Sequence, residues 1–363
     1  MTVPPRRIAA AAPGESWESV LWIGGGLLAG SREHLSSRSG RFVLVSSAGS
    51  RAPAGEVRRS LGAAILAEIE IDDREEAKTL STVSRIADTA LGAGVRRDDA
   101  VVAVGGGVVC DVAGFAAAIL LRGIAWNAVP TTTGAMSDAA IGGKTGVDHS
   151  TGKNRIGAFH PPAAVLIDPA AAATLPDRDY RAGLVEAFKA AWIADAELAS
   201  RIEDSLERLL ARDEDALLAA VAGAAAIKAA IVSEDLKEGD RRRLLNFGHT
   251  AGHAFEAAGG YRDLRHGEAV AWGIAAALEI SLRRAGLSGG EAARIRSALS
   301  RLGPFPEPSR DRAVLSSFLA GDKKFTSRGM AGVLLERIGR GKVVESVPLE
   351  EWLGAAERAS LTV

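Results

Sequence analysis

Several features that would assign this 363-residue sequence to a particular class of protein are scarce or missing. Its one cysteine, Cys110, excludes an internal disulfide and is typical of a protein in a reducing cytoplasm. Lys and Arg number 44 against 45 Asp and Glu, so no charge excess indicates a nucleic acid or an anionic membrane as partner. The apolar run near the N-terminus is too short for a signal peptide. We therefore expect a cytoplasmic protein that is long enough for two domains.

Long hydrophobic runs are also scarce. The most membrane-like segment is "GGGVVCDVAGFAAAILL", residues 105–121, which contains Asp111. A membrane-spanning helix needs about 20 apolar residues, and this run is shorter. The segment therefore predicts a buried helix.

The first half of the chain alternates strand-like and helix-like patterns. Apolar, β-branched runs predict strands, and the segments between them have helical periodicity that stops at glycine. The predicted strands cover residues 41–49, 64–72, 98–107, 125–133 and 163–169, with helices at 75–94 and 108–123. This order favours a parallel sheet with helices on its faces.

After about residue 178 the pattern becomes a succession of amphipathic helices. One short hairpin is expected in "GVLLERIGRGKVVESV", residues 332–347. The sequence thus predicts an α/β domain over residues 1–178 and a mostly α-helical domain over residues 179–363.

Two glycine-rich segments lie where an α/β sheet binds phosphates. "VVAVGGGVVCDVAGF" leads from a strand into a helix, but it does not match the dinucleotide fingerprint G-x-G-x-x-G. A tight turn with no ligand would have the same pattern. Residues 130–162 read as a long loop that carries Asp138, Lys144, Lys153 and Asn154. Lysines and an asparagine among glycines favour capture of a phosphorylated substrate, and a solvated loop is the alternative.

Half of the six histidines lie in "NFGHTAGHAFEAAGGYRDLRHGEAV", residues 246–270. His249 and His253 are four residues apart and share one helix face. Thr250 stands where a zincin motif H-E-x-x-H needs glutamate, which makes that class of metalloprotease improbable. His266 begins the next helical pattern, and a helix that returns would bring it back toward His249.

A catalytic zinc site typically has three protein ligands and one open position. Glu186, in the apolar segment "GLVEAFKAAW", is the best carboxylate candidate because a glutamate on such a face needs a partner. The alternative is that the three histidines are hydrogen-bonded core residues.

Ordered motifs along the chain resemble those of the 3-dehydroquinate synthases, members of the sugar-phosphate cyclase superfamily. The resemblance extends from about residue 70 to about residue 324. The motifs are "DREEAKTL", "GGGVVCDVAGF", "GGKTGV", "GKNRIGAFHPP", "GLVEAFK", "LLNFGHTAGHAFE", "RHGEAVAWG" and "GDKKF".

The resemblance implies a dehydroquinate synthase-like fold, with an α/β Rossmann-like NAD-binding domain followed by an all-α metal-binding domain. It implies that 3-deoxy-arabino-heptulosonate 7-phosphate is converted to 3-dehydroquinate, a step of the shikimate pathway. The implied cofactors are NAD and a divalent metal, most often Zn²⁺, with Co²⁺ as an alternative. The implied assembly is a homodimer that acts on a small phosphorylated sugar acid.

The resemblance also assigns roles to residues. Glu186, His249 and His266 match the metal ligands, whereas His253 matches a histidine on the substrate side. Substrate contacts fall on Asp138, Lys144, Asn154, Lys189, Lys228, Arg242, Asn246, Lys323 and Lys324, and on Arg122, which in the family reaches the phosphate of a neighbouring subunit. NAD contacts fall on Glu75, Lys78, Gly106, Gly107, Val108, Asp111, Thr131, Thr132, Lys153, Thr174 and Leu175.

The sequence departs from the family pattern at a few positions. Ser46 and Ser47 stand where an acidic or amide residue usually lies near the adenosine ribose, and Asp148 replaces an asparagine. Three alternative functions remain at this point. They are a cyclase for the amino analogue of the heptulosonate, a metal-dependent alcohol dehydrogenase, and a binding protein without catalysis.

Overall fold

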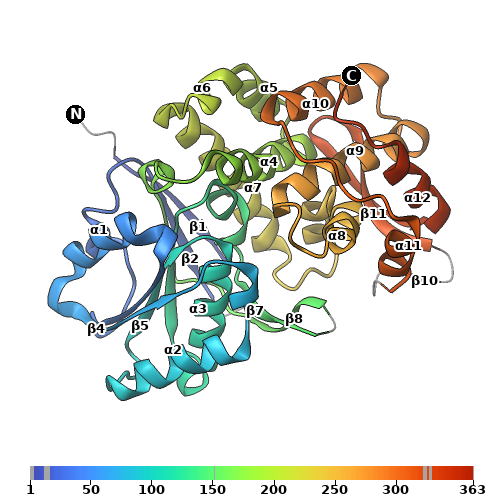
Figure 1. The fold of residues 1–363 in the computed structure, drawn as a ribbon. Coiled ribbons are helices and arrows are strands. Elements are labelled where there is room, and N and C mark those ends of the chain that lie inside the picture. The colour runs from blue at the N-terminus through green and yellow to red at the C-terminus, as the bar shows by residue number, and fades with distance from the viewer. Residues whose placement is uncertain (1–3, 12–16, 151, 322–324, 327–328, 363) are drawn as a thin grey trace. The chain divides into compact units, whose positions relative to one another are not determined.

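The computed structural model of the protein describes residues 4–11, 17–150, 152–321, 325–326 and 329–362 (Figure 1). The chain forms two compact units. Unit 1 comprises Met1–Pro176 and Leu217–Lys237, and unit 2 comprises Asp177–Ala216 and Glu238–Val363. The chain enters unit 2 at Asp177 and returns to unit 1 through most of helix α7 (Glu214–Glu234), while the division into domains 1–178 and 179–363 stays a prediction.

Unit 1 is built on a seven-stranded sheet with the order β1-β2-β9-β6-β5-β3-β4. Its strands are β1 (Arg6–Ala10), β2 (Ser19–Ile23), β3 (Phe42–Ser47), β4 (Ile65–Ile71), β5 (Ala100–Gly105), β6 (Ala125–Pro130) and β9 (Ala164–Ile167). Only β1 and β2 pair antiparallel in this sheet, and all other neighbours are parallel. The predicted parallel sheet is confirmed.

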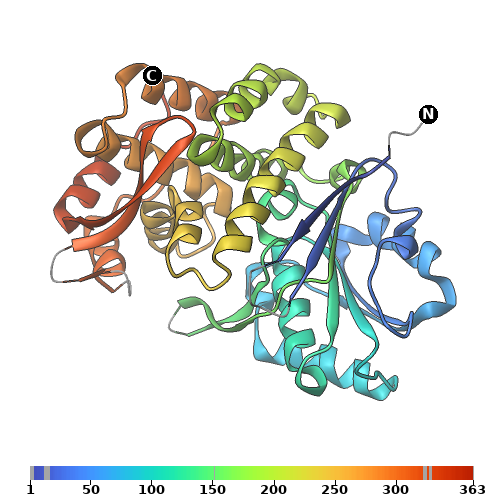
Figure 2. The same ribbon diagram turned by 180° about the vertical axis from the view of Figure 1, so that it is seen from behind.

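Burial explains why some strands could be predicted from the sequence and others could not. All residues of β3, β5 and β9 are buried, as expected for strands with helices on both faces. Strand β1, dark blue in Figure 2, is mostly exposed and begins with two arginines. It lies at the sheet edge, where neither alternation nor an apolar run is required.

Helices α1 (Arg51–Leu61), α2 (Leu80–Gly92) and α3 (Gly107–Ile119) connect the parallel strands. Thr79 caps α2 by accepting a hydrogen bond from the Thr82 backbone N–H at 3.1 Å. Helix α3 packs against α2, β5 and β6 and is largely buried, as the sequence predicted for residues 105–121. By length and composition alone, α7 is the one helix in the described residues that could cross a membrane. Of its most apolar stretch, 61% is buried inside the protein.

The interpretation of residues 130–162 as a loop was wrong in part. The segment contains a π-helical turn at Ala135–Ala139 and a hairpin of β7 (Lys144–His149) and β8 (Gly152–Phe159), which extends away from the main sheet in Figure 1. Gly146 and Gly157 oppose each other across the hairpin, and a Cβ atom on either would collide with backbone of the other strand. These glycines permit the close pairing but interrupt the alternation by which a strand is recognised.

Unit 2 is mostly helical, as predicted for the C-terminal part. Its helices are α4 (Asp177–Ala194), α5 (Ala196–Asp204), α6 (Leu206–Leu210), α8 (His249–Ala258), α9 (His266–Arg284), α10 (Gly289–Leu302), α11 (Arg312–Gly321) and α12 (Leu349–Arg358). The predicted hairpin is confirmed as β11 (Gly329–Arg337) and β12 (Arg340–Val347), which continue a three-stranded sheet from β10 (Phe325–Thr326).

Helices α8 and α9 approach each other unusually closely because glycine lies at their contact. A Cβ on Gly273 would overlap the carbonyl oxygen of Gly248, and a Cβ on Gly252 would meet the Ala269 carbonyl oxygen at 3.0 Å. Gly248 also has a positive φ of 79°, which glycine adopts without strain and which starts α8. This contact places the histidine-bearing turns of both helices in the same region.

Candidate active site

Three histidines form one cluster in unit 2. His249 begins α8, His253 follows one turn later, and His266 is the first residue of α9. The ring centroids lie 5.1 to 5.8 Å apart. One ring nitrogen from each of the three histidines lies within 4.8 Å of those of the other two. The cluster therefore presents converging nitrogen donors of the kind that bind a divalent metal.

The most buried ring of the cluster is that of His249, which is 8% exposed. Burial lowers its pKa well below the ordinary value, and the nearby Lys189 ammonium and the two other imidazoles lower it further. Its Nδ1 lies 3.2 Å from the carbonyl oxygen of Phe247, which fits a neutral ring with the proton on Nδ1. The lone pair of Nε2 is then available to a metal.

Glu186 and Lys189 approach the cluster from α4. Glu186 is 4% exposed, forms an ion pair with Lys189, and has Oε1 3.6 Å from Nε2 of His266. Among the described residues, neither oxygen of Glu186 has a hydrogen-bond partner. A buried carboxylate that accepts no hydrogen bond is stabilised by positive charge nearby. A metal cation bound by the histidines would supply such charge. The donor set of two imidazoles and one carboxylate suits Zn²⁺ or Co²⁺.

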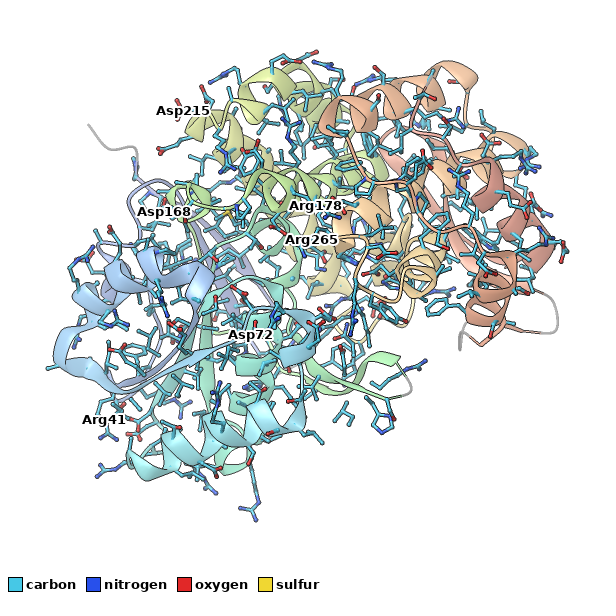
Figure 3. The ribbon with its side chains drawn as sticks, in the orientation of Figure 1. Arg41, Asp72, Asp168, Arg178, Asp215 and Arg265 are labelled. Atoms are coloured by element: carbon cyan, nitrogen blue, oxygen red, sulfur yellow. The ribbon has the colours of Figure 1, made fainter. Side chains whose placement is uncertain are left out.

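Two buried glutamates lie around the start of α9, and the sequence analysis identified neither. Glu268 is fully buried and accepts hydrogen bonds from Arg178 Nε at 2.7 Å and from the Arg265 backbone N–H at 2.7 Å. It thereby closes the first turn of α9, beside which Arg178 and Arg265 are labelled in Figure 3. Glu256, on α8, has Oε2 3.4 Å from Nδ1 of His266.

The arginine triplet 241–243 has three different environments at the 3₁₀ helix Arg241–Asn246. Arg242 is 1% exposed, whereas Arg241 is exposed. Arg243 pairs with Glu345 through Nη1 at 2.7 Å. Asn246 donates through Nδ2 to Glu238 Oε1 at 2.6 Å. The middle arginine is thus the one held inside the protein.

In unit 1 the glycine turn opens the amino end of α3, with Gly106 as its N-cap. The backbone N–H of Thr131 donates to the Gly105 carbonyl at 3.0 Å, which brings the ends of β5 and β6 together. A Cβ on Gly106 would lie 3.0 Å from Cγ2 of Thr132. Free N–H groups at a helix start, next to glycine, form an anion site. Gly107, Val108 and Thr132 lie around the same turn.

Lys78 is the centre of a polar cluster in unit 1. Its Nζ lies 2.8 Å from Asp111 Oδ2 and 3.8 Å from Glu75 Oε1, and it donates a short hydrogen bond to Asn154 Oδ1. Lys153 Nζ lies 3.4 Å from the same Glu75 oxygen. Burial alone would lower the pKa of Lys78, but Asp111 and Glu75 raise it above its ordinary value. Burial raises the pKa of Asp111. The structure thus joins four residues that the sequence analysis assigned to NAD with Asn154, which it assigned to the substrate.

Asp148, the departure from the family asparagine, is hydrogen-bonded within the β7–β8 hairpin and to the segment of Lys78. Oδ1 of Asp148 accepts the backbone N–H of Asn154 at 2.7 Å, and Asn154 has a positive φ of 54°. Asparagine tolerates this left-handed conformation better than most residues. The backbone N–H of Asp148 in turn donates to the Lys78 carbonyl at 2.9 Å. Asp148 therefore ties the β8 residue Asn154 to the Lys78 cluster.

The remaining predicted site residues have varied surroundings. Lys228 on α7 contacts Asp138 Oδ1 through Nζ at 2.5 Å. Arg122 and Lys144 are exposed, while Thr174 and Leu175 follow the turn Pro169–Ala172. Lys323 and Lys324 lie outside the described residues.

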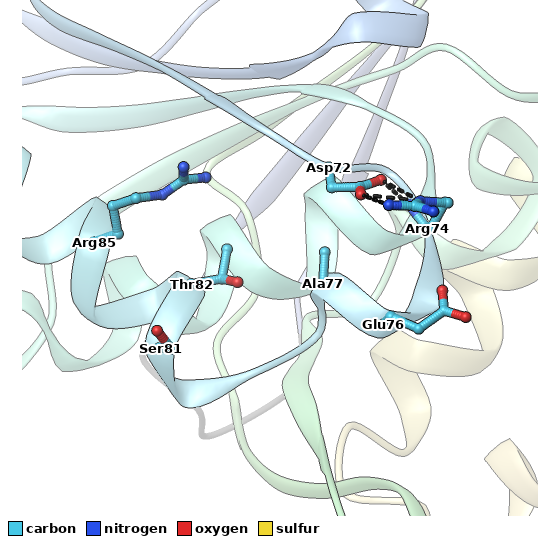
Figure 4. A pocket seen from close by; sticks show the side chains of 7 residues that line it. All are labelled: Asp72, Arg74, Glu76, Ala77, Ser81, Thr82 and Arg85. Atoms are coloured by element: carbon cyan, nitrogen blue, oxygen red, sulfur yellow. Dashed lines mark hydrogen bonds and ion pairs between the residues drawn. The ribbon is translucent and has the colours of Figure 1, made fainter.

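An open pocket of about 420 Å³ lies in unit 1, lined by Asp72, Arg74, Glu76, Ala77, Ser81, Thr82 and Arg85 (Figure 4). Asp72 and Arg74 lie side by side in its lining and form an exposed ion pair at 2.5 Å. None of the predicted site residues lines this pocket, so it is not the candidate site.

Solved structures share the fold. The chain matches 2-deoxy-scyllo-inosose synthase, crystallised with carbaglucose-6-phosphate, NAD⁺ and Co²⁺, with a TM-score of 0.84, 25% identity, and coverage of 98% of this chain and 100% of that chain. A 2-epi-5-epi-valiolone synthase from Streptomyces hygroscopicus subsp. jinggangensis 5008, with NAD⁺ and Zn²⁺ bound, matches with a TM-score of 0.82, 31% identity, and coverage of 95% and 97%. The fold is that of the sugar-phosphate cyclases.

Sequence comparisons define the family. The family model described as 3-dehydroquinate synthase N-terminal matches residues 68–182, and the one described as 3-dehydroquinate synthase C-terminal matches residues 183–325. A 3-dehydroquinate synthase from Solibacter usitatus (strain Ellin6076) is 41% identical over 324 residues, which is 89% of this chain and 91% of the relative. The chain belongs to the 3-dehydroquinate synthase family, which confirms the resemblance noted in the sequence.

The Lys78 cluster generates a prediction about stability. Lys78→Met would leave Asp111 beside Glu75 without its neutralising ammonium, and we expect the free energy of unfolding to fall by about 3 kcal/mol. Urea unfolding without NAD measures this loss. The matched control is Arg74→Met, because Arg74 is 75% exposed in its pair with Asp72 and its loss should change the free energy of unfolding little. Equal small losses in both variants would contradict a stabilising role for Lys78.

Proposed function

We propose that this protein is a 3-dehydroquinate synthase, a carbon–oxygen lyase that converts 3-deoxy-arabino-heptulosonate 7-phosphate into 3-dehydroquinate and phosphate. The observation that carries the proposal is the cluster of His249, His266 and buried Glu186 in a chain that belongs to this family. The reaction would serve the shikimate pathway in the cytoplasm. An amino-dehydroquinate synthase activity is the second candidate, because that substrate has a carboxylate too.

The proposed metal ligands are Glu186, His249 and His266, with His253 on the substrate side. All three imidazoles converge, so distance alone does not separate His253 from the other two. The resemblance supports the assignment, and so does the carboxylate of Glu186 that faces His266. Zn²⁺ is the metal we favour and Co²⁺ the alternative, since cyclases of this fold have been crystallised with each.

NAD is proposed to bind at the glycine turn of unit 1. Gly106, Gly107 and Val108 would hold its pyrophosphate at the start of α3. Glu75, Lys78, Asp111 and Lys153 are already joined in one cluster, which supports a shared role in binding this cofactor. Thr131, Thr132, Thr174 and Leu175 complete the proposed contacts.

When bound, the metal would supply Lewis acidity toward a substrate hydroxyl and NAD would supply a reversible hydride acceptor, a combination that gives no net redox change. The residues of the chain bind and orient the substrate. Asp138, Lys144, Asn154, Lys189, Lys228, Asn246 and the pair Lys323 and Lys324 are the proposed polar contacts. Holding the phosphate, carboxylate and hydroxyls together lets the phosphate leave and the ring close in one site.

Arg242 is proposed to select substrates that carry a carboxylate. Its planar guanidinium can form two parallel hydrogen bonds to a carboxylate, and its burial reduces screening by water. Arg122 is exposed and is proposed to reach the phosphate site of a neighbouring subunit, which makes the active form a homodimer.

The reaction itself is tested by measuring phosphate release from the heptulosonate phosphate while following NADH absorbance. We expect catalytic phosphate release that requires NAD and metal, without accumulation of NADH, because the hydride returns to the product. A metal-dependent alcohol dehydrogenase would instead accumulate NADH. Release from the amino analogue alone would favour the second candidate.

The ligand assignment is tested by metal analysis of two variants. We expect His266→Ala to lose most of its metal and its activity, because one of three ligands is removed. His253→Ala is the matched control from the same cluster and should keep its metal while losing activity. Full metal occupancy in His266→Ala, or loss of metal in His253→Ala, would overturn the ligand set.

The role of Arg242 is tested against its exposed neighbour. Arg242→Ala should lose about 2–4 kcal/mol of transition-state binding, or roughly 30- to 1000-fold in kcat/KM. Arg242→Lys should be nearly as harmful, since lysine keeps the charge but not the planar pair of donors. Arg241→Ala should change kcat/KM little. Equal small losses at both positions would remove the main support for a carboxylate-bearing substrate.

A further inference from the structure

We propose that Glu256 is a positioning residue of the metal site, whose carboxylate holds the ring of His266 so that Nε2 faces the metal. The inference rests on the proposed ligand set of Glu186, His249 and His266. Glu256 belongs to neither the metal ligands nor the substrate contacts proposed above. It acts through His266 and would touch neither metal nor substrate.

The geometry of the His266 ring supports this role. Nδ1 lies 3.4 Å from Glu256 Oε2, and Nε2 lies 3.6 Å from Glu186 Oε1. Each ring nitrogen therefore faces a different carboxylate. If Nδ1 donates its proton to Glu256, the lone pair of Nε2 points toward Glu186, where a shared cation would be bound by both.

Exposure explains why such a contact is needed. The side chain of His266 is 48% exposed, whereas that of Glu256 is 3% exposed. A half-exposed imidazole has packing on one side only, here from the rings of His249 and His253, so polar contacts contribute to limiting its rotation. The anchoring carboxylate is itself buried on α8, the helix that carries His249 and His253. The contact thus couples the orientation of the α9 ligand to the helix that carries the others.

His249 has the same arrangement with a different acceptor. Its Nδ1 lies 3.2 Å from the Phe247 carbonyl oxygen, which leaves Nε2 as the donor to a metal. Both proposed histidine ligands therefore have their Nδ1 beside an oxygen. At His266 the acceptor is charged, which makes the imidazole a stronger donor to a dication.

Glu256→Ala removes the acceptor, and we expect Zn²⁺ affinity to fall roughly 10- to 100-fold. Glu256→Gln keeps an oxygen that can accept the same hydrogen bond but lacks the charge, so it should recover part of the affinity. Glu279→Gln is the matched control. Glu279 lies further along α9 and pairs with Arg296, so its loss should leave Zn²⁺ affinity unchanged.

The experiment uses the full chain after its metal has been removed with a chelator. Zn²⁺ is titrated in competition with a chromophoric chelator, the visible spectrum of the Co²⁺-loaded protein is recorded, and the melting temperature of the metal-free protein is measured. We expect weaker Zn²⁺ binding and an altered Co²⁺ spectrum for Glu256→Ala, with partial recovery for Glu256→Gln. A lower melting temperature with unchanged affinity and spectrum would show a merely structural role and overturn the proposal.

Two further outcomes are distinguishable. If Glu256→Ala does not fold, Glu256→Gln decides, and wild-type affinity together with a wild-type Co²⁺ spectrum in that variant overturns the proposal. If the wild-type protein binds neither Zn²⁺ nor Co²⁺, the ligand set of the proposed function has failed, and the positioning role fails with it.

Discussion

The close contact between α8 and α9 is the constraint on which the histidine cluster depends. Gly248, Gly252 and Gly273 leave no room for a Cβ atom between the two helices. Because His249 and His266 each begin one of these helices, the helix separation sets the distance between their rings. Glu268 then closes the first turn of α9, and Glu256 reaches from one helix to the other. Backbone proximity and two buried carboxylates together convert two separate helix starts into one cluster.

Charge organises unit 1 in a different way. The Lys78 ammonium neutralises Asp111 and Glu75 while it also holds Asn154 of the β7–β8 hairpin. The residues come from the segment after β4, from α3 and from β8, so local sequence spacing gives no sign that they meet. These two acidic groups depend on one buried lysine, because removal of Lys78 would leave both carboxylates without its charge.

The sequence predicted the parts of the structure that have strong periodicity. Apolar strands β3, β5 and β9 and the glycine turn before α3 were visible because burial on both faces requires continuous apolar runs. The β7–β8 hairpin was missed because Gly146 and Gly157 interrupt its pattern, and β1 because it is an exposed edge strand. The histidines were found by their scarcity. Glu256 was not, because its partner His266 is ten residues away and the turn between α8 and α9 decides whether they meet.

The unequal exposure of the two proposed histidine ligands has a kinetic consequence. The side chain of His266 is 48% exposed, while His249 is 8% exposed and Glu186 is 4% exposed. An incoming or departing ion would therefore exchange on the His266 side, with the two buried residues as its last contacts. Such a site would equilibrate with the ions around the protein, and the general order of affinities among divalent metals would not by itself select one of them. Availability in the surrounding medium would then decide which metal the protein carries.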